Sequence, residues 1–262
     1  MYFYELHAHT NAASLCSIVE PEEYIDFYIE RGFSGMVVTD HFYHGNTSID
    51  RSLPWDMFVD EFCQGYIRAK REGDKRGFTV LFGFEQKFAS GCDEYIVLGI
   101  SPEWLKAHPE IKDMPRCEFF ETVRAAGGFT IQAHPFRERY YVPDIRLALE
   151  RVDAVEVMNL GDDLKFSRRS YEYAKNLGLP MTAGSDIHST IGFSVVAGMA
   201  TENKINTVEE LIGAIKNGSA VPAPCERFER IKQEPLDENI ALSVLALDGN
   251  ELVLTENYFA KK

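Results

Sequence analysis

The sequence predicts an α/β fold in which about seven strands form a closed or nearly closed, TIM-like barrel. Short apolar runs alternate along the chain with longer amphipathic patterns, which is typical of parallel βαβ units. Many of the apolar runs end in a polar side chain able to bind a metal, and in a barrel these strand ends could converge at one mouth. The 262 residues, of which 45% are hydrophobic, suffice to bury one large core.

The predicted strands are short apolar segments rich in β-branched and aromatic residues. The first is the aromatic run that begins at Tyr2 and ends at His7 and His9. The segment 78–84 is expected to lie beside 95–98, because a Gly-containing turn separates them. In chain order the predicted strands are 2–6, 35–39, 78–84, 95–98, 129–132, 154–158, 181–184 and 195–200.

The predicted helices carry the usual signals at their ends. Pro21 stands at the first position of a helix whose first turn holds Glu22 and Glu23, where the helix dipole favours acids, and Gly32 stops it. A glycine pair at 127–128 ends a later helix in the same way. The predicted helices cover residues 21–31, 54–76, 115–126, 164–177 and 208–216.

The helical and strand patterns loosen from about Pro222. We therefore expect one large domain, residues 1–221, followed by a C-terminal extension, residues 222–262. Within the extension, the apolar segments 241–247 and 251–254 flank an Asp-Gly turn signal and predict a β-hairpin. We expect this hairpin to be an appendage that takes no part in the functional site.

The chain is acidic, with 41 acidic and 27 basic side chains and a formal net charge of −14. This balance argues against broad binding to nucleic acid or to anionic membranes, which both need many cationic contacts, and a small substrate fits it better. Apolar runs of about 18 residues and a signal-peptide pattern are absent, so we expect a soluble cytoplasmic protein. The sequence does not indicate an oligomeric state.

The cysteines are five in number, scattered, and never arranged as Cys-x-x-Cys. Reduced, mostly structural thiols are the expectation for such a set. Cys16 lies in the loop after the first predicted strand and could face the site, but we expect it to be a buried, inert thiol.

Seven strand-end residues predict a metal site. His7 and His9 project from one face of their strand, because side chains alternate along a strand, so they can share an ion. Five of the chain's seven histidines lie at predicted strand ends, which random placement would not favour. The predicted ligands are His7, His9, His41, Glu85, His134, Asp186 and His188.

Imidazole and carboxylate ligands suit borderline divalent ions such as Zn²⁺, Mn²⁺ and Fe²⁺, and we expect no thiol to compete with them. The ligands are too many for one ion. A carboxylate such as Glu85 can bridge two ions, and ions about 3.5 to 4 Å apart can hold the attacking and leaving oxygens of a phosphoryl displacement. We therefore expect two or three divalent ions.

Five motifs, in their order along the chain, resemble the PHP superfamily, named for polymerase and histidinol phosphatase. The resemblance covers about residues 3 to 200 and implies a distorted seven-stranded β/α barrel that hydrolyses phosphoesters through a metal-bound hydroxide. The motifs are His7-Ala8-His9-Thr10, Thr39-Asp40-His41, Gly83-Phe84-Glu85, Ala133-His134-Pro135 and Gly184-Ser185-Asp186-Ile187-His188.

The resemblance also implies how the ligands divide among the ions. Matching motif to motif, the first ion would be held by His7, His9, Asp186 and the bridging Glu85, the second by His134 and Glu85, and the third by His41 and His188.

The chain departs from the family's pattern at two places. The loop of residues 11–16 has no carboxylate or imidazole to complete the third position. The family often has a histidine near the start of the strand that follows the bridging Glu, where this chain has Asp93 and Glu94. Either acid could supply an oxygen ligand, and the alternative is that both are ordinary solvated turn residues.

Three further residues are expected to support the site. Arg137, three residues after His134, could hold a substrate phosphate bidentately, or form a surface salt bridge with Glu138 or a neighbour. Asp40 and Asn159 are expected to orient ligands or their loops without binding metal.

The leading hypothesis is a phosphoric ester hydrolase for a small phosphorylated molecule, with Asp186, Glu85 and His188 as catalytic residues and no protein nucleophile. A second hypothesis applies the same metal site to a C–N or other ester bond. A third is a degenerate metal-binding module with a regulatory or structural role. An exonuclease is less favoured, because the chain is acidic and shows no track of aromatic and basic residues.

Overall fold

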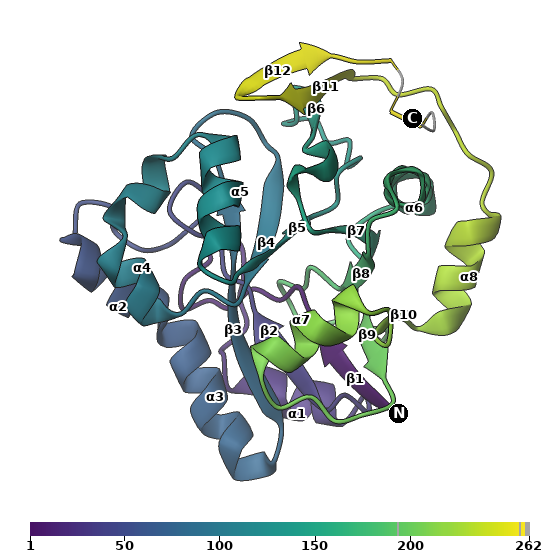
Figure 1. Cartoon of the computed structure of the whole chain (residues 1–262). Helices are drawn as coiled ribbons and strands as arrows, with labels where there is room; N and C mark the ends of the chain where they lie inside the picture. The colour runs from purple at the N-terminus through teal and green to yellow at the C-terminus, as the bar shows by residue number, and fades with distance from the viewer. Residues whose placement is uncertain (193, 257, 260–262) are drawn as a thin grey trace.

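A nine-stranded sheet forms the centre of the computed structural model, which describes residues 1–192, 194–256 and 258–259 (Figure 1). The strand order is β10-β9-β1-β2-β3-β4-β5-β7-β8, and β8 also contacts β9 and β10, so the sheet nearly closes into a barrel. The strands are β1 (Tyr2–Glu5), β2 (Gly35–Val38), β3 (Thr79–Lys87), β4 (Glu94–Leu98), β5 (Phe129–Gln132), β7 (Ala154–Asn159), β8 (Met181–Gly184), β9 (Gly198–Thr201) and β10 (Val221–Ala223).

The α/β barrel class is confirmed, but the strand count and the directions differ from those expected. The sheet has nine strands where about seven are expected, and β4 and β9 run antiparallel to their neighbours. The link from β3 to β4 spans only residues 88–93, which is too short for a crossover helix, so β4 must return antiparallel to β3. As a result Glu94, the first residue of β4, lies at the same end of the barrel as the carboxyl ends of its neighbours β3 and β5.

Helices cover the outside of the sheet (Figure 1). The helix predicted over 54–76 is instead two helices that meet at Cys63, whose ψ of −5° departs from α-helical geometry and breaks the run. The helices are α1 (Glu23–Ile29), α2 (Trp55–Phe62), α3 (Gln64–Arg76), α4 (Pro102–Ala107), α5 (Arg116–Ala125), α6 (Leu164–Leu177), α7 (Val208–Lys216) and α8 (Cys225–Gln233), with 3₁₀ turns η1 (Pro109–Asp113) and η2 (Leu149–Arg151).

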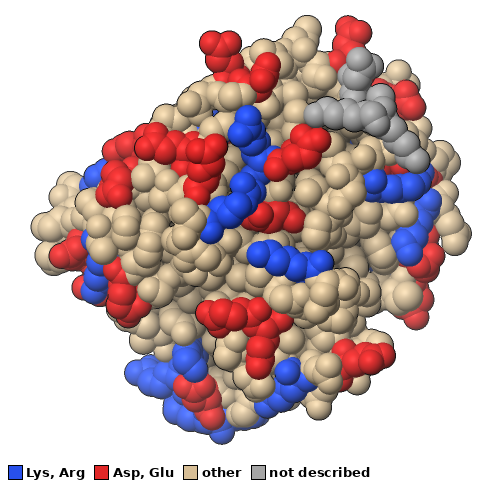
Figure 2. All heavy atoms as spheres, in the orientation of Figure 1, with Lys and Arg blue, Asp and Glu red and all other residues tan. Residues whose placement is uncertain are grey.

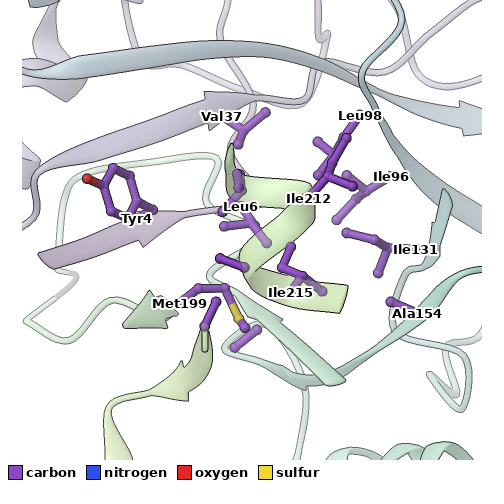
Figure 3. Packing of buried hydrophobic residues seen from close by; sticks show 14 of the residues in the cluster. Tyr4, Leu6, Val37, Ile96, Leu98, Ile131, Ala154, Met199, Ile212 and Ile215 are labelled. Carbon is purple, nitrogen blue, oxygen red and sulfur yellow. The ribbon is translucent and has the colours of Figure 1, made fainter. Parts of the chain in front are cut away.

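Helix α7 packs over the end of the barrel opposite the predicted ligands. Its start is fixed by a capping box between Thr207 and Glu210. Figure 3 shows Ile212 and Ile215 among strand side chains that include Val37 and Leu98. Leu98 is the last residue of β4, at the end of that strand away from Glu94, so α7 packs into the barrel from the end opposite the predicted ligands.

The C-terminal extension contains the predicted hairpin, formed by β11 (Ser243–Asp248) and β12 (Glu251–Leu254). β11 also pairs in parallel with β6 (Asp144–Leu147), a strand that the sequence pattern did not reveal. Arg169 of α6, which is fully buried, donates to the backbone oxygens of Asp237 and Asn239 and pairs with Glu138. The extension is thus attached to the segment that follows His134.

The surface seen in Figure 2 carries acidic and basic side chains interspersed in small groups. Among the described residues, none of the helices combines the length and the apolar character needed to cross a membrane.

We expect Ile215→Ala to lower the free energy of unfolding by about 2–5 kcal/mol, because it leaves a cavity where α7 packs into the barrel. Denaturant unfolding monitored by circular dichroism measures the change. Ile67→Ala is the matched control, since Ile67 is also helical but 47% exposed, and it should change the free energy by less than about 0.5 kcal/mol. Equal losses in the two variants would contradict this role for α7.

Candidate metal centre

The predicted strand-end residues meet at one end of the barrel. The parallel strands bring them there at or near their carboxyl ends, and β4 brings its first residue because it runs the other way. A cavity of about 490 Å³ opens onto them. Its lining includes Cys16, His41, Glu85, Lys87, Glu94, His134, Arg137, Tyr141, Asp186 and His188.

Glu85, which is 1% exposed, lies at the centre of this cluster. Its Oε1 is 3.0 Å from His7 Nε2 and 3.4 Å from His134 Nε2. Its Oε2 is 2.5 Å from His41 Nδ1 and 3.8 Å from His9 Nε2. One buried carboxylate therefore faces four imidazoles, which is an arrangement suited to a bridge between two ions.

Asp186 faces the same imidazoles from the end of β8. Its Oδ1 is 3.2 Å from His9 Nε2 and 3.4 Å from His7 Nε2, and its Oδ2 accepts a hydrogen bond of 2.7 Å from Arg137. The φ angle of Asp186 is +54°, in the left-handed region that favours glycine. Such a conformation costs on the order of 1–3 kcal/mol, so the surrounding contacts must hold it.

His134 has the same kind of strain, with a φ of +30°, and its backbone N–H donates to Glu156 Oε2 over 3.0 Å. Its Nε2 lies 3.6 Å from Glu94 Oε2. Asp93, the other acid considered, points away from the cluster and pairs with Arg116 over 2.6 Å. The structure therefore brings Glu94 and not Asp93 to the candidate ligands, because successive side chains of an extended chain point to opposite sides.

His41 and His188 both stack against His9, with ring centroids 4.2 Å and 4.4 Å from it and 6.0 Å from each other. One nitrogen from each of the three rings can be chosen so that all lie within 4.8 Å of one another. Cys16 lies beside them, with its Sγ 3.2 Å from His41 Nε2. The expectation of a buried thiol is wrong, because the loop folds back so that Cys16 is exposed and lines the cavity.

Glu156 is a member of the cluster that the sequence analysis missed. Its Oε1 lies 2.9 Å from His7 Nδ1, so it holds the ring whose other nitrogen faces Glu85. A Cβ on Gly184 would lie 2.9 Å from this same carboxylate oxygen, so glycine leaves it room. The sequence does carry a signal for Glu156, since it is the single acid within the apolar β7. A buried carboxylate is costly unless it has a partner, so such a residue predicts a partner inside the barrel.

Asp40 and Asn159 have the supporting positions expected of them. Asp40 Oδ1 accepts hydrogen bonds from the Thr10 backbone N–H, at 2.6 Å, and from the Ser14 hydroxyl, at 2.7 Å, which fixes the loop after His9. Asn159 donates to Glu156 Oε2 over 2.9 Å and accepts from Arg137 over 3.0 Å.

Arg137 is held inside the site. Its Nε donates to Asp162 Oδ1 over 2.6 Å, and its Nη2 reaches both Asn159 and Asp186. The alternative surface salt bridge with Glu138 is wrong, because Glu138 pairs with the buried Arg169. Among the described residues, no hydrogen bond is recorded for Arg137 Nη1. Nη1 of the guanidinium can therefore donate to a bound group.

The charges of the cluster stabilise one another. Burial raises the pKa of Asp186, but the neighbouring His7 and Arg137 outweigh it and hold this pKa well below its usual range. Glu85 behaves in the same way, with His41 and His7 as the lowering neighbours of its pKa. Burial and the nearby His41 lower the pKa of His9 to about 3, which keeps this imidazole in the neutral form that binds metal.

Unpartnered buried atoms test whether these residues fit a metal. In the described part of the chain, His7 Nε2, His41 Nδ1 and both carboxylate oxygens of Glu85 are buried and lack a hydrogen bond of acceptable geometry, although they lie close together. Buried polar atoms are rarely left so, and a divalent cation would satisfy all of them. The donor set fits a metal centre.

Solved structures of similar fold were found among bacterial proteins. A two-domain protein containing a predicted PHP-like metal-dependent phosphoesterase, from Bacteroides vulgatus, matches 84% of this chain with a TM-score of 0.62 and 14% identity, and the chain spans 64% of that protein. The match to PsfC from Pseudomonas syringae covers 88% of this chain and 95% of PsfC, with a TM-score of 0.56 and 16% identity. The match to an amidohydrolase from Chromobacterium violaceum, solved with bound sulfate and no metal, covers 85% of this chain and 99% of that protein. Its TM-score is 0.50 and the identity is 17%.

Curated protein sequences give no match. Two family descriptions do match, the PHP domain over residues 5–153 and the PHP-associated region over residues 166–220. The first covers more than half of the chain and contains the His7, His41, Glu85 and His134 motifs. The chain therefore belongs to the PHP family.

Proposed function

We propose that the protein is a phosphoesterase that hydrolyses a small phosphorylated substrate. Membership of the PHP family and the clustered imidazoles and carboxylates support the broader class, a metal-dependent hydrolase. The choice of a phosphoester within that class is the step that we propose, and it depends mainly on Arg137.

The position of Arg137 is the observation that favours a phosphoester. Its guanidinium lies against Asp186, at the edge of the candidate ligand cluster, and lines the cavity with Lys87. Two cations beside the cluster suit a substrate whose anionic group remains charged during the reaction. The neutral carbonyl of an amide would gain less from this pair.

The candidate ligands are numerous enough to hold more than one ion. We propose that His7, His9, Glu85 and Asp186 hold one ion, that Glu85, His134 and Glu94 hold a second, and that His41 and His188 contribute to a third. When bound, such ions supply Lewis-acid polarisation of a phosphoryl oxygen and a water of lowered pKa.

The chain's own residues would position the reaction. Glu156 fixes the ring of His7, and Asp40 fixes the loop that follows His9. Arg137 Nη1 would contact a phosphate oxygen, while Asp162 and Asn159 keep the guanidinium in place. No side-chain nucleophile is assigned.

The cavity volume of about 490 Å³ is in the range of small-ligand sites, which supports a small substrate. The net charge of −14 and the interspersed charges in Figure 2 do not favour a long nucleic acid.

Turnover assays on metal-loaded protein test the proposal. Phosphomonoesters, phosphodiesters and amides would be offered to the protein loaded with Zn²⁺, Mn²⁺ or Fe²⁺. Release of phosphate or alcohol from an ester supports a phosphoesterase. Hydrolysis of amides alone would contradict it in favour of C–N chemistry, and stoichiometric metal without any hydrolysis would favour a regulatory or structural module.

Asp186→Asn and Glu85→Gln should nearly abolish turnover and reduce bound metal. Loss of a partner that merely orients a ligand costs roughly 10- to 100-fold, and a ligand itself should cost more. Steady-state kinetics and metal analysis by mass spectrometry measure the two effects. Unchanged turnover in either variant would refute the proposed ligand set.

Glu156→Gln should lower the affinity for the first divalent ion by about 10- to 100-fold, because it removes the charge that orients the ring of His7. Calorimetric titration with Zn²⁺ measures this affinity. Glu229→Gln is the control, since Glu229 is a half-exposed acid paired with Lys232. Equal affinities in wild type and Glu156→Gln would remove Glu156 from the metal centre.

Arg137→Ala should raise KM by about 10- to 100-fold, the value of one or two hydrogen bonds to a charged group. Metal content must be measured beside KM, because Arg137 also contacts Asp186. A raised KM with full metal content supports the phosphate role. If KM is unaffected, or if only the metal content falls, Arg137 acts through Asp186 and not on the substrate.

A further inference from the structure

Cys16 lies on the wall of the cavity that the candidate ligands also line. Its Sγ lies 3.2 Å from His41 Nε2, and Cys16 lines the cavity together with His188. These two imidazoles and His9 already form one of the groups whose nitrogens are close enough to share an ion. The sulfur therefore lies against one member of a group of ring nitrogens that can share an ion.

Both imidazoles turn Nδ1 towards an oxygen of the protein, and in His188 this contact is a hydrogen bond. His41 Nδ1 lies 2.5 Å from Glu85 Oε2, and His188 Nδ1 lies 2.8 Å from the backbone oxygen of Asp186. An imidazole that donates from Nδ1 presents the Nε2 lone pair as its ligand atom. For His41, Nε2 is the nitrogen that faces Cys16.

The loop that carries Cys16 is fixed on both sides of this residue. Ser14 donates to Asp40, and the Leu15 N–H donates to the backbone oxygen of Asn46 over 2.9 Å. On the other side, Ser17 Oγ donates to the His9 backbone oxygen over 2.7 Å, and the Ile18 N–H donates to that of His188 over 3.0 Å. The sulfur is thus held beside the two rings by the backbone.

We propose that Cys16, His41 and His188 form a mixed thiolate–imidazole subsite for a thiophilic divalent cation. Sulfur and imidazole ligands suit Zn²⁺, Co²⁺ and Fe²⁺, whereas Mg²⁺ and Ca²⁺ prefer oxygen. The proposal supplies the ligand that the loop of residues 11–16 seemed to lack. It concerns which ion the protein binds, and it holds whether or not the substrate is a phosphoester.

Cobalt substitution tests the subsite without any activity assay. Metal-free protein would be titrated with Co²⁺ while the near-ultraviolet absorption is recorded, because a thiolate ligand gives a sulfur-to-cobalt charge-transfer band that nitrogen and oxygen ligands do not. We expect this band in the wild type and its complete loss in Cys16→Ser, with about one Co²⁺ fewer bound per chain. Cys225→Ser is the matched control, since Cys225 is also exposed but begins α8 away from the cavity, and it should keep the band.

A second variant separates loss of the ligand from loss of the fold. Cys16→His replaces the sulfur by a nitrogen ligand, so we expect the number of bound ions to return to the wild-type value while the charge-transfer band stays absent. The proposal is overturned if the wild type binds Co²⁺ without the band, or if Cys16→Ser keeps the band. It is also overturned if excess Mg²⁺ displaces the ion that gives the band.

Discussion

The buried carboxylate of Glu85 is the constraint on which the centre depends. A carboxylate removed from water is strongly destabilised unless cations or metal ions surround it. Here four imidazoles from three parts of the chain face its two oxygens, and His7 and His41 hold its pKa low. The ends of β1, β2 and β5 must therefore converge on β3, and that convergence is the mouth of the barrel.

Strain at the centre is balanced by contacts outside it. His134 and Asp186 both have left-handed backbone conformations, and each is held by a neighbouring side chain. Glu156 accepts from the His134 backbone, and Arg137 donates to Asp186. Residues held in this way are characteristic of functional sites, where position matters more than local stability.

The C-terminal extension contacts the segment that follows His134, although the domain boundary expected near residue 222 would separate the two. Arg169 connects Glu138 to the backbone at Asp237 and Asn239, and β11 pairs with β6 just after the segment that carries Arg137. The extension is therefore coupled to the segment that follows His134. The division of the chain into two domains stays a prediction.

The sequence alone determined the barrel class and the strand-end histidines, because strand periodicity and residue chemistry are local properties. His7, His9, His41, Glu85, His134, Asp186 and His188 all lie together in the structure. Only the tertiary structure decided that Glu94 and not Asp93 faces the cluster, since this depends on the antiparallel course of β4. The same holds for Cys16 and Glu156, because a loop that folds back and a carboxylate inside an apolar strand reveal their partners only once distant segments pack together.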